Sequence, residues 1–105
     1  MSNFDPPVHI SVVLVTWNSA ATLARCLDCL AAQTRKDFEV VLVDNGSTDG
    51  CLDEVESRWP GLTLRVEYLK SNRGFAAANN IGTHLARGKW LALLNSDAFP
   101  EPDWL

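Results

Sequence analysis

The sequence lacks any long apolar run. No stretch approaches the ~20 residues that a membrane-spanning helix needs. The segment from Met1 to Pro7 has neither basic residues nor the apolar centre of a signal peptide. We therefore expect a cytoplasmic protein without a transmembrane segment.

An excess of positive charge is also missing. The chain has 9 Lys and Arg against 13 Asp and Glu, a formal net charge of -4, and its basic residues are scattered. General nucleic-acid binders usually present a strongly positive patch. The composition therefore excludes that class, and we expect no nucleic-acid partner.

Cysteine is scarce. Cys26, Cys29 and Cys51 are an odd number of thiols in a chain with no secretory signal, so we expect them to be reduced. Cys26 and Cys29 have the Cys-x-x-Cys spacing, but they lie in a predicted helix with no second pair to complete a zinc site. We interpret them as small packing residues.

Two glycine-rich nucleotide motifs are absent as well. The chain contains neither the Gly-x-Gly-x-x-Gly fingerprint of dinucleotide binders nor a phosphate loop ending in Gly-Lys-Ser/Thr. A nucleotide bound by this protein must be held in another way.

Four segments of the chain are predicted strands. Residues 10–16 and 38–44 are apolar and β-branched, as expected for strands covered on both faces. Residues 62–69 alternate apolar and polar side chains, which is typical of an edge strand. Residues 89–95 form the last strand, in which we expect Trp90 to belong to the core.

Three helices are expected between these strands. The first starts with Ser19 as N-cap and continues with apolar residues three and four apart up to a polar turn that begins at Gln33. The second covers roughly 50–58, and the third lies within 71–88 and ends at Gly88. The alternating order predicts an open, doubly wound α/β fold with a mainly parallel sheet and helices on both faces, formed by residues 1–105 as a single domain.

Polar residues gather where three of the predicted strands end. They are Thr16 to Asn18, Asp44 to Ser47, and Asn95 to Asp97. Ligands of such sheets bind outside the carboxyl ends of the strands. Each group alone also fits a turn or a helix start. Acidic residues at two neighbouring strand ends, however, favour a metal ion or sugar hydroxyls over simple packing.

Four stretches of the chain carry a family resemblance. They are 11-SVVLVTWNSAATLARCLDCLAAQT-34, 38-FEVVLVDNGSTDG-50, 72-NRGFAAANNIG-82 and 91-LALLNSDAFPEPDWL-105. Together they resemble the N-terminal half of the family 2 inverting glycosyltransferases of the GT-A, Rossmann-like fold. The resemblance implies a nucleotide-diphosphate sugar as donor and a divalent cation, Mg2+ or Mn2+.

The resemblance also implies which residues lie along the donor. These are Thr16, Trp17, Asn18, Asp44, Gly46, Ser47, Asp49, Arg73, Gly74, Asn79 and Asn80. Among them Asp44 resembles the carboxylate that contacts the base, and Arg73 resembles a diphosphate contact. For Trp17, stacking on a base or sugar and packing over the first helix are both open.

Asn95, Ser96 and Asp97 occupy the place of the family's Asp-x-Asp motif. Asp97 is the expected metal ligand, because a hard cation that neutralises a departing diphosphate takes oxygen ligands. Asn95 stands where many members have aspartate, which removes one negative charge. The Asn-x-Asp pattern resembles rhamnosyltransferases, so dTDP-linked and UDP-linked donors are both expected.

No residue of the chain is a candidate for the catalytic base of inverting transfer. In the family that base lies beyond the metal motif, so we expect a truncated donor-binding half that is weakly active or inactive alone. A non-catalytic scaffold module and a nucleotidyltransferase-like domain are the alternatives. If the sheet stops at residues 89–95, this strand has an open edge, which predicts a homo-oligomer formed through it.

Overall fold

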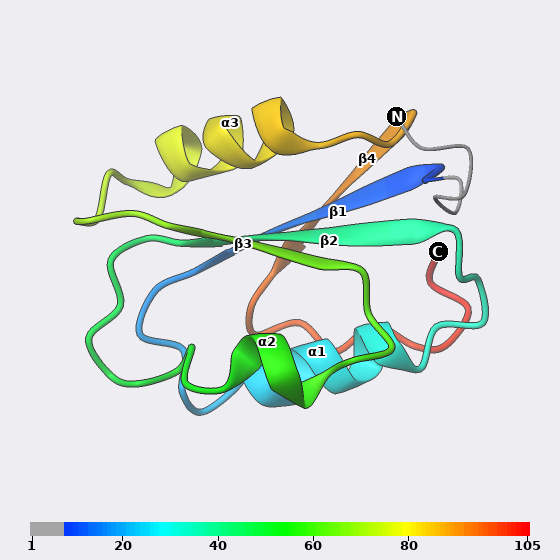
Figure 1. Cartoon of the computed structure of the whole chain (residues 1–105), viewed down its shortest axis with the longest axis horizontal. Coiled ribbons are helices and arrows are strands. Elements are labelled where there is room, and N and C mark those ends of the chain that lie inside the picture. The colour runs from blue at the N-terminus through cyan, green and yellow to red at the C-terminus, as the bar shows by residue number, and fades with distance from the viewer. Residues whose placement is uncertain (1–7) are drawn as a thin grey trace.

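Four parallel strands form one sheet in the computed structural model, which describes residues 8–105 (Figure 1). The expectation about Met1 to Pro7 lies outside the described residues. The elements are β1 (Ile10–Thr16), α1 (Leu23–Ala31), β2 (Phe38–Asp44), α2 (Val55–Arg58), β3 (Leu64–Tyr68), α3 (Phe75–Leu85) and β4 (Trp90–Asn95). The strand order is β3-β2-β1-β4, and every pair is parallel. The predicted α/β fold is confirmed.

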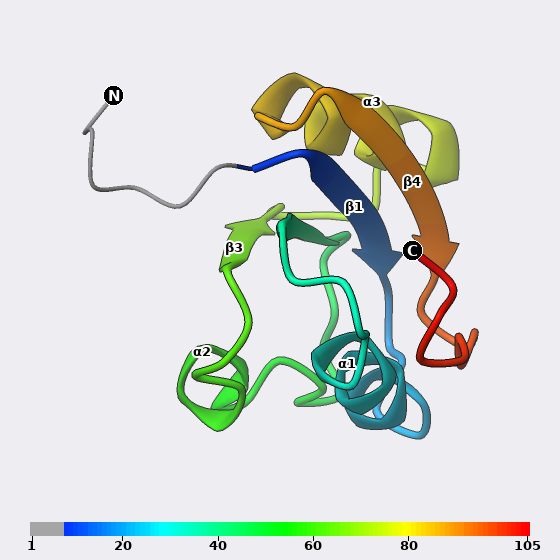
Figure 2. The same cartoon turned by 90° about the vertical axis from the view of Figure 1, so that its right-hand side faces the viewer.

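Helices cover both faces of the sheet. Helices α1 and α2 lie on one face and α3 lies on the other (Figure 2). All residues of β1 and β2 are buried, as their apolar sequences predicted. Alternation along β1 directs Val12 and Leu14 into the core beneath α1, while Val15 packs in the smaller cluster beneath α3.

The core beneath α1 depends on apolar residues spaced three and four apart. Leu23, Cys26, Leu27 and Leu30 are the buried residues of this helix. Burying one such leucine contributes about 1.5–3 kcal/mol. The helix begins at Leu23, so the prediction that Ser19 is its N-cap is wrong. The carbonyl of Ser19 instead accepts the amides of Thr22 and Leu23 in a turn that precedes the helix.

The other two helices are shorter than predicted. Helix α2 has only 4 residues and is anchored by buried Val55 and by Trp59, whose indole N–H donates to the Asp28 carboxylate over 2.7 Å. Helix α3 ends at Leu85, before Gly88. Gly88 serves a close backbone approach, because a Cβ there would lie 2.6 Å from the amide nitrogen of Ser11.

Strand β4 lies at one end of the sheet and β3 at the other, as predicted for both. Helix α3 packs on β1 and β2, so the side chains of β4 on that face are uncovered, with Leu91 51% and Leu93 58% exposed. The prediction that Trp90 is a core residue is wrong. It is 59% exposed, because β4 has a strand neighbour on one side only. Within residues 8–105 no helix is both long and apolar enough to cross a bilayer.

A buried carboxylate ties the α3–β4 connection to the sheet. Glu39, 1% exposed, accepts hydrogen bonds from the Ser11 hydroxyl at 2.6 Å and from the amide and Nε of Arg87 at 2.7 and 3.1 Å. The Ser11 hydroxyl in turn accepts the amide of Gly88 at 2.8 Å. Burial alone raises the pKa of Glu39, but these hydrogen bonds outweigh it and hold the pKa below its ordinary value.

Replacing Glu39 by glutamine should lower the free energy of unfolding at neutral pH by about 1–3 kcal/mol, because an amide N–H2 would face hydrogen-bond donors. The folded-state pKa is depressed, so the stabilisation is full above the unfolded-state pKa. It is lost as the pH falls through the folded-state value. Urea unfolding across acid and neutral pH should therefore show the difference between wild type and Glu39→Gln shrinking in acid.

The matched control is Glu67→Gln, which changes a half-buried carboxylate of β3. We expect this substitution to change stability by about 0.5 kcal/mol or less. A stability difference for Glu39→Gln that stays constant at every pH would contradict the role assigned to the carboxylate.

Candidate functional site

The carboxyl ends of β1, β2 and β4 open on one rim of the sheet. Thr16 is in register with Asp44, and Val15 is in register with Asn95. The three groups of polar residues that follow these strands therefore share one rim, as the sequence predicted. They do not all share one cavity.

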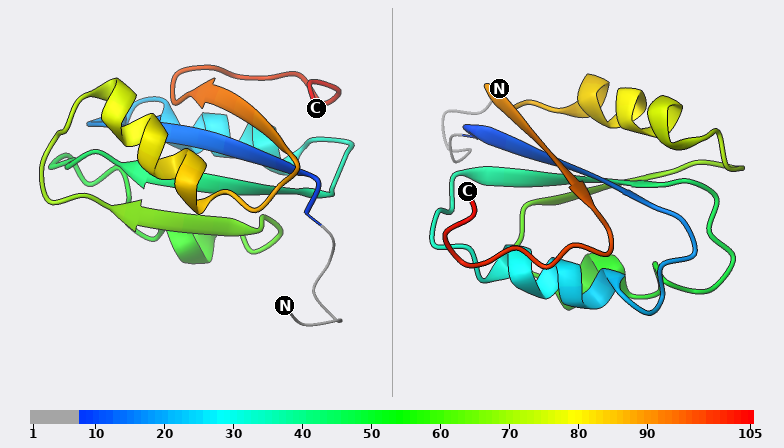
Figure 3. Two further views of the ribbon diagram at one scale, coloured as in Figure 1. Left: turned by 90° about the horizontal axis from the view of Figure 1, so that it is seen from above. Right: turned by 180° about the vertical axis from the view of Figure 1, so that it is seen from behind.

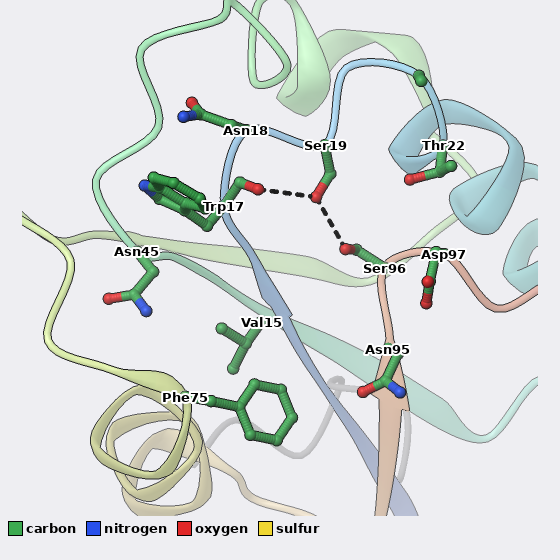
Figure 4. Close-up of a pocket in the computed structure, with 11 residues that line it drawn as sticks. Val15, Trp17, Asn18, Ser19, Thr22, Asn45, Phe75, Asn95, Ser96 and Asp97 are labelled. Carbon is green, nitrogen blue, oxygen red and sulfur yellow. Dashed lines mark hydrogen bonds between the residues drawn. The ribbon is translucent and has the colours of Figure 1, made fainter.

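A cleft of about 560 Å³ lies on this rim between the ends of β1 and β4 (Figure 4). This volume is within the range of about 300–1,000 Å³ typical of small-molecule sites. Five of the predicted site residues line the cleft, namely Trp17, Asn18, Asn95, Ser96 and Asp97. Among the described residues that line it, Asp97 is the one acidic side chain.

Hydrogen bonds join the loop after β1 to the loop after β2. The amide of Asn18 donates to the Ser47 hydroxyl at 2.9 Å, and the Asn18 side-chain oxygen accepts the amide of Thr48 at 2.8 Å. Asp49 accepts the amides of Ala20 at 2.9 Å and Cys51 at 3.1 Å. Desolvation opposes ionisation of Asp49, but these hydrogen bonds outweigh it and lower its pKa. Ser47 and Asp49 thus shape the rim without lining the cleft.

Asp44 lies apart from the cleft. Its carboxylate accepts the amide of Ser47 at 3.0 Å, and it lines a smaller hollow of about 370 Å³ together with Tyr68. Successive residues at the end of a strand point to opposite faces, so it is the next residue, Asn45, that lines the cleft. Contact of Asp44 with a base stays a prediction.

Asn45 holds the loop that leads into α3. Its side chain is 3% exposed; the oxygen accepts the amide of Arg73 at 2.9 Å, and the nitrogen donates to Asn72 and to the Gly74 carbonyl at 3.2 and 3.3 Å. Arg73 itself is exposed and does not line the cleft. The loop nevertheless places Phe75, the first residue of α3, at the edge of the cleft.

Five other predicted residues also lie outside the cleft, namely Thr16, Gly46, Gly74, Asn79 and Asn80. Thr16 is 1% exposed, and its hydroxyl has no hydrogen-bond partner within the described chain. Gly74 precedes α3 with φ +86°. Within the helix, the side chain of Asn79 donates to the Phe75 carbonyl at 3.1 Å, and Asn80 is exposed.

The end of β4 is bonded to α1 and to the turn that precedes it. The hydroxyls of Ser96 and Ser19 lie 2.9 Å apart, and Ser19 donates to the Trp17 carbonyl at 3.2 Å (Figure 4). The Cys26 thiol donates to the Asn95 carbonyl at 3.8 Å. Burial, with smaller effects of Cys29 and Asp97, raises the pKa of Cys26 to about 12, so this thiol stays protonated. The three cysteines are unpaired, as predicted.

The donor set at the end of β4 fits a cation that arrives with a diphosphate. Asp97 is exposed in the cleft beside the amide of Asn95 and the hydroxyl of Ser96. Residues 8–105 contain no group of three or more His, Cys, Asp or Glu that forms a cation cage of its own. Mg2+ is commonly held by one or two carboxylates together with substrate phosphates, and Asp97 meets that requirement.

Several residues that line the cleft were not among the predicted donor contacts. They are Val15, Ser19, Ala21, Thr22, Asn45 and Phe75. The period-two alternation of β1 and β2 contained a signal for Val15 and Asn45, because both lie on the face covered by α3. No sequence signal placed Phe75 there, because its position depends on the loop that Asn45 holds.

The comparisons with known proteins agree with this arrangement. A family model, Glycosyl transferase family 2, matches residues 11–105. The PGL/p-HBAD biosynthesis glycosyltransferase of Mycobacterium tuberculosis is 44% identical over 88 residues, which cover 83% of this chain and 34% of that protein. The chain therefore spans about a third of that relative's length.

Two solved structures share the fold. S. aureus TarS 1-349 in complex with UDP-GlcNAc has a TM-score of 0.85 at 33% identity, with 90% of this chain and 28% of that chain covered. The mannosyltransferase PcManGT from Pyrobaculum calidifontis, in complex with GDP-Man and Mn2+, has a TM-score of 0.82 at 32% identity, with 91% and 30% covered.

Replacing Gly46 by alanine should destabilise the rim. Gly46 has φ +85°, and a Cβ there would lie 2.8 Å from the carbonyl carbon of Ser71. The strained backbone alone costs about 1–3 kcal/mol, and the contact adds to this. In the control Gly61→Ala, the new Cβ meets no atom within 4 Å. Urea unfolding should separate the two variants, and equal stability would contradict the close approach of these loops.

Proposed function

Because the chain belongs to glycosyltransferase family 2, we propose that residues 1–105 form the donor-binding part of an inverting glycosyltransferase that uses a nucleotide-diphosphate sugar and a divalent cation. One observation carries this proposal: the exposed carboxylate of Asp97 lies in a cleft at the carboxyl ends of parallel strands. The nucleotide sugars named in the two neighbouring complexes support the donor class.

The residues of the cleft would contact different parts of the donor and its cation. Trp17 is 52% exposed at the cleft and offers an aromatic surface for a base or a sugar. Asn95 and Ser96 offer an amide and a hydroxyl to donor oxygens. Asp97 would hold the cation, Mg2+ or Mn2+, which neutralises the negative charge that develops on the departing diphosphate.

Glycosyl transfer also needs a general base that accepts the proton of the attacking hydroxyl. Within the described part of the cleft, Asp97 is the sole carboxylate, and its proposed role is to hold the cation. We therefore propose that the 105-residue chain binds donor but transfers little or no sugar by itself. The Asn-x-Asp pattern at residues 95–97 supports a dTDP-linked deoxysugar as donor, with UDP-linked sugars as the other choice.

Titration calorimetry with UDP and dTDP, each with and without Mn2+, tests the donor site. In Asp97→Asn the carboxylate is replaced by an amide of the same shape, and loss of such a ligand should weaken Mn2+-dependent binding about tenfold or more. Binding without the metal should change little. The control is Asp103→Asn, which removes an exposed carboxylate outside the cleft and should bind as the wild type does.

Equal Mn2+-dependent affinity in wild type and Asp97→Asn would contradict the role of this residue. If the wild type binds neither nucleotide at millimolar concentration, the donor-binding proposal fails. That result would instead favour a non-catalytic scaffold module or a nucleotidyltransferase-like domain with other ligands.

The open edge of β4 leads to a second proposal, that the chain forms a homo-oligomer through it. Leu91 and Leu93 are exposed on the strand that ends the described sheet, and its outer backbone groups are available for pairing. A second copy that pairs with β4 about a two-fold axis would bury these leucines.

Leu93→Lys should convert such a dimer to a monomer, because the substitution places a charge in the apolar part of the interface. Sedimentation velocity at tens of micromolar measures the change. The control is Thr63→Lys, which adds the same charge at an exposed residue before β3, the opposite edge strand. A wild type that sediments as a monomer would overturn the proposal.

A further inference from the structure

Gln33 is a buried polar residue that the donor-binding proposal leaves unexplained. It follows α1 and is 1% exposed. Its Nε2 donates to the carbonyls of Cys29 at 3.2 Å and Glu101 at 2.7 Å, and its Oε1 accepts the amide of Leu105 at 3.1 Å. Both ends of this amide side chain are thus bonded to main-chain groups, two of them far away in the sequence.

The partners of Gln33 belong to a segment that we call the strap, residues 98–105. The strap runs from the end of β4 back along α1 (Figure 3). Thr34 adds two bonds to the Pro102 carbonyl, from its amide at 2.8 Å and from its hydroxyl at 3.2 Å. Near the β4 end of the strap, the guanidinium of Arg25 lies 4.1 Å from the centre of the Phe99 ring. The strap is therefore fastened along the length of α1.

Asp97 lies between β4 and the strap. The amide of Ala98 donates to the Asn95 carbonyl at 3.0 Å and closes a turn that contains Ser96 and Asp97. On the β4 side, Asn95 and Ser96 are bonded to Cys26 and Ser19. On the other side, the path of the chain after Ala98 is held by the hydrogen bonds that join the strap to Gln33 and Thr34. The exposed Asp97 carboxylate is thus placed by its backbone, which these two anchors hold.

We propose that Gln33 is a positioning residue for the Asp97 carboxylate, acting through the strap. The hydrogen bonds of Gln33 and Thr34 to residues 101–105, which we call the clamp, lie beyond the C-terminal end of α1, whereas Cys26, which contacts the turn, lies within the helix. This proposal rests on the donor-binding function in one respect, namely that Asp97 holds the cation. An apolar residue of similar size in place of Gln33 would fill the space but leave the Glu101 carbonyl and the Leu105 amide unpaired.

Amide hydrogen exchange measured by NMR on Gln33→Met tests the proposal without any ligand. Three amides report on the strap: Thr34 and Leu105 at the clamp, and Ala98 at the turn. All three should exchange about tenfold faster or more than in the wild type, while amides in the centre of β2 keep their protection. Faster exchange at Thr34 and Leu105 with no change at Ala98 would overturn the positioning role.

The matched control is Val55→Ala, which removes buried apolar volume from α2 without touching the strap. It should lower global stability and leave the exchange of Ala98 relative to β2 unchanged. If Gln33→Met does not fold, Thr34→Val tests whether the strap steadies the turn, which is the step through which Gln33 acts, because this substitution removes only the hydroxyl bond to Pro102. A smaller acceleration at Ala98 is then expected, and none at all would overturn the proposal.

A second readout connects the strap to the site. Loss of a group that orients a metal ligand typically costs about tenfold or more in metal affinity, so Gln33→Met should weaken Mn2+-dependent binding of UDP or dTDP by that factor, and Val55→Ala should not. If the wild type binds no nucleotide, the donor-binding function fails, and the exchange at Ala98 still decides the role of Gln33.

Discussion

The parallel pairing of β1 with both of its neighbours is the constraint on which the rest of the structure depends. Because β2 and β4 both run parallel to β1, the chain must return after each strand to the same end of the sheet. The loops that follow the strands are thereby collected on one rim. The cleft exists because two of these rim segments, after β1 and after β4, are brought together from distant parts of the sequence.

Hydrogen bonds between loops then give this rim its shape. Asn18 and Ser47 join the first loop to the second, and Asn45 joins the second to the segment before α3. Many of the polar residues that stood out in the sequence form such hydrogen bonds between loops and do not face the cleft. A smaller number, with Trp17 and Asp97 among them, present their side chains to the cleft itself.

Strands β1 and β2 were predictable to the residue, because they are buried on both faces and must be apolar throughout. Strand β3 is shorter than predicted at both ends, and β4 begins one residue later. The start of α1 was not predictable, since the hydroxyl of Ser19 bonds to Ser96, a contact between residues far apart in the sequence. Trp90 was misplaced although β4 was predicted to be an edge strand, because an apolar side chain on an edge strand reads in the sequence like one in the core. These errors concern tertiary contacts, which periodicity does not contain.

The candidate site was predictable as a rim but only partly as a cavity. Predicted residues at the ends of β1 and β4 do line the cleft. Asp44 and Asn45 face opposite sides of the sheet, however, so that Asn45 lines the cleft and Asp44 does not. In the sequence, only the alternation at the end of β2 distinguishes the two residues. Gln33 read as part of a polar turn, yet it is buried, because its partners lie in the strap.

The most direct test of the central claim is the location of bound Mn2+ by paramagnetic broadening of amide NMR signals in the presence of UDP or dTDP. We expect selective broadening around residues 95–98, with weaker effects at residues 17–19 across the cleft. Broadening centred instead on Asp53, Glu54 and Glu56, at the start of α2, would contradict the assignment of the cleft as the donor site.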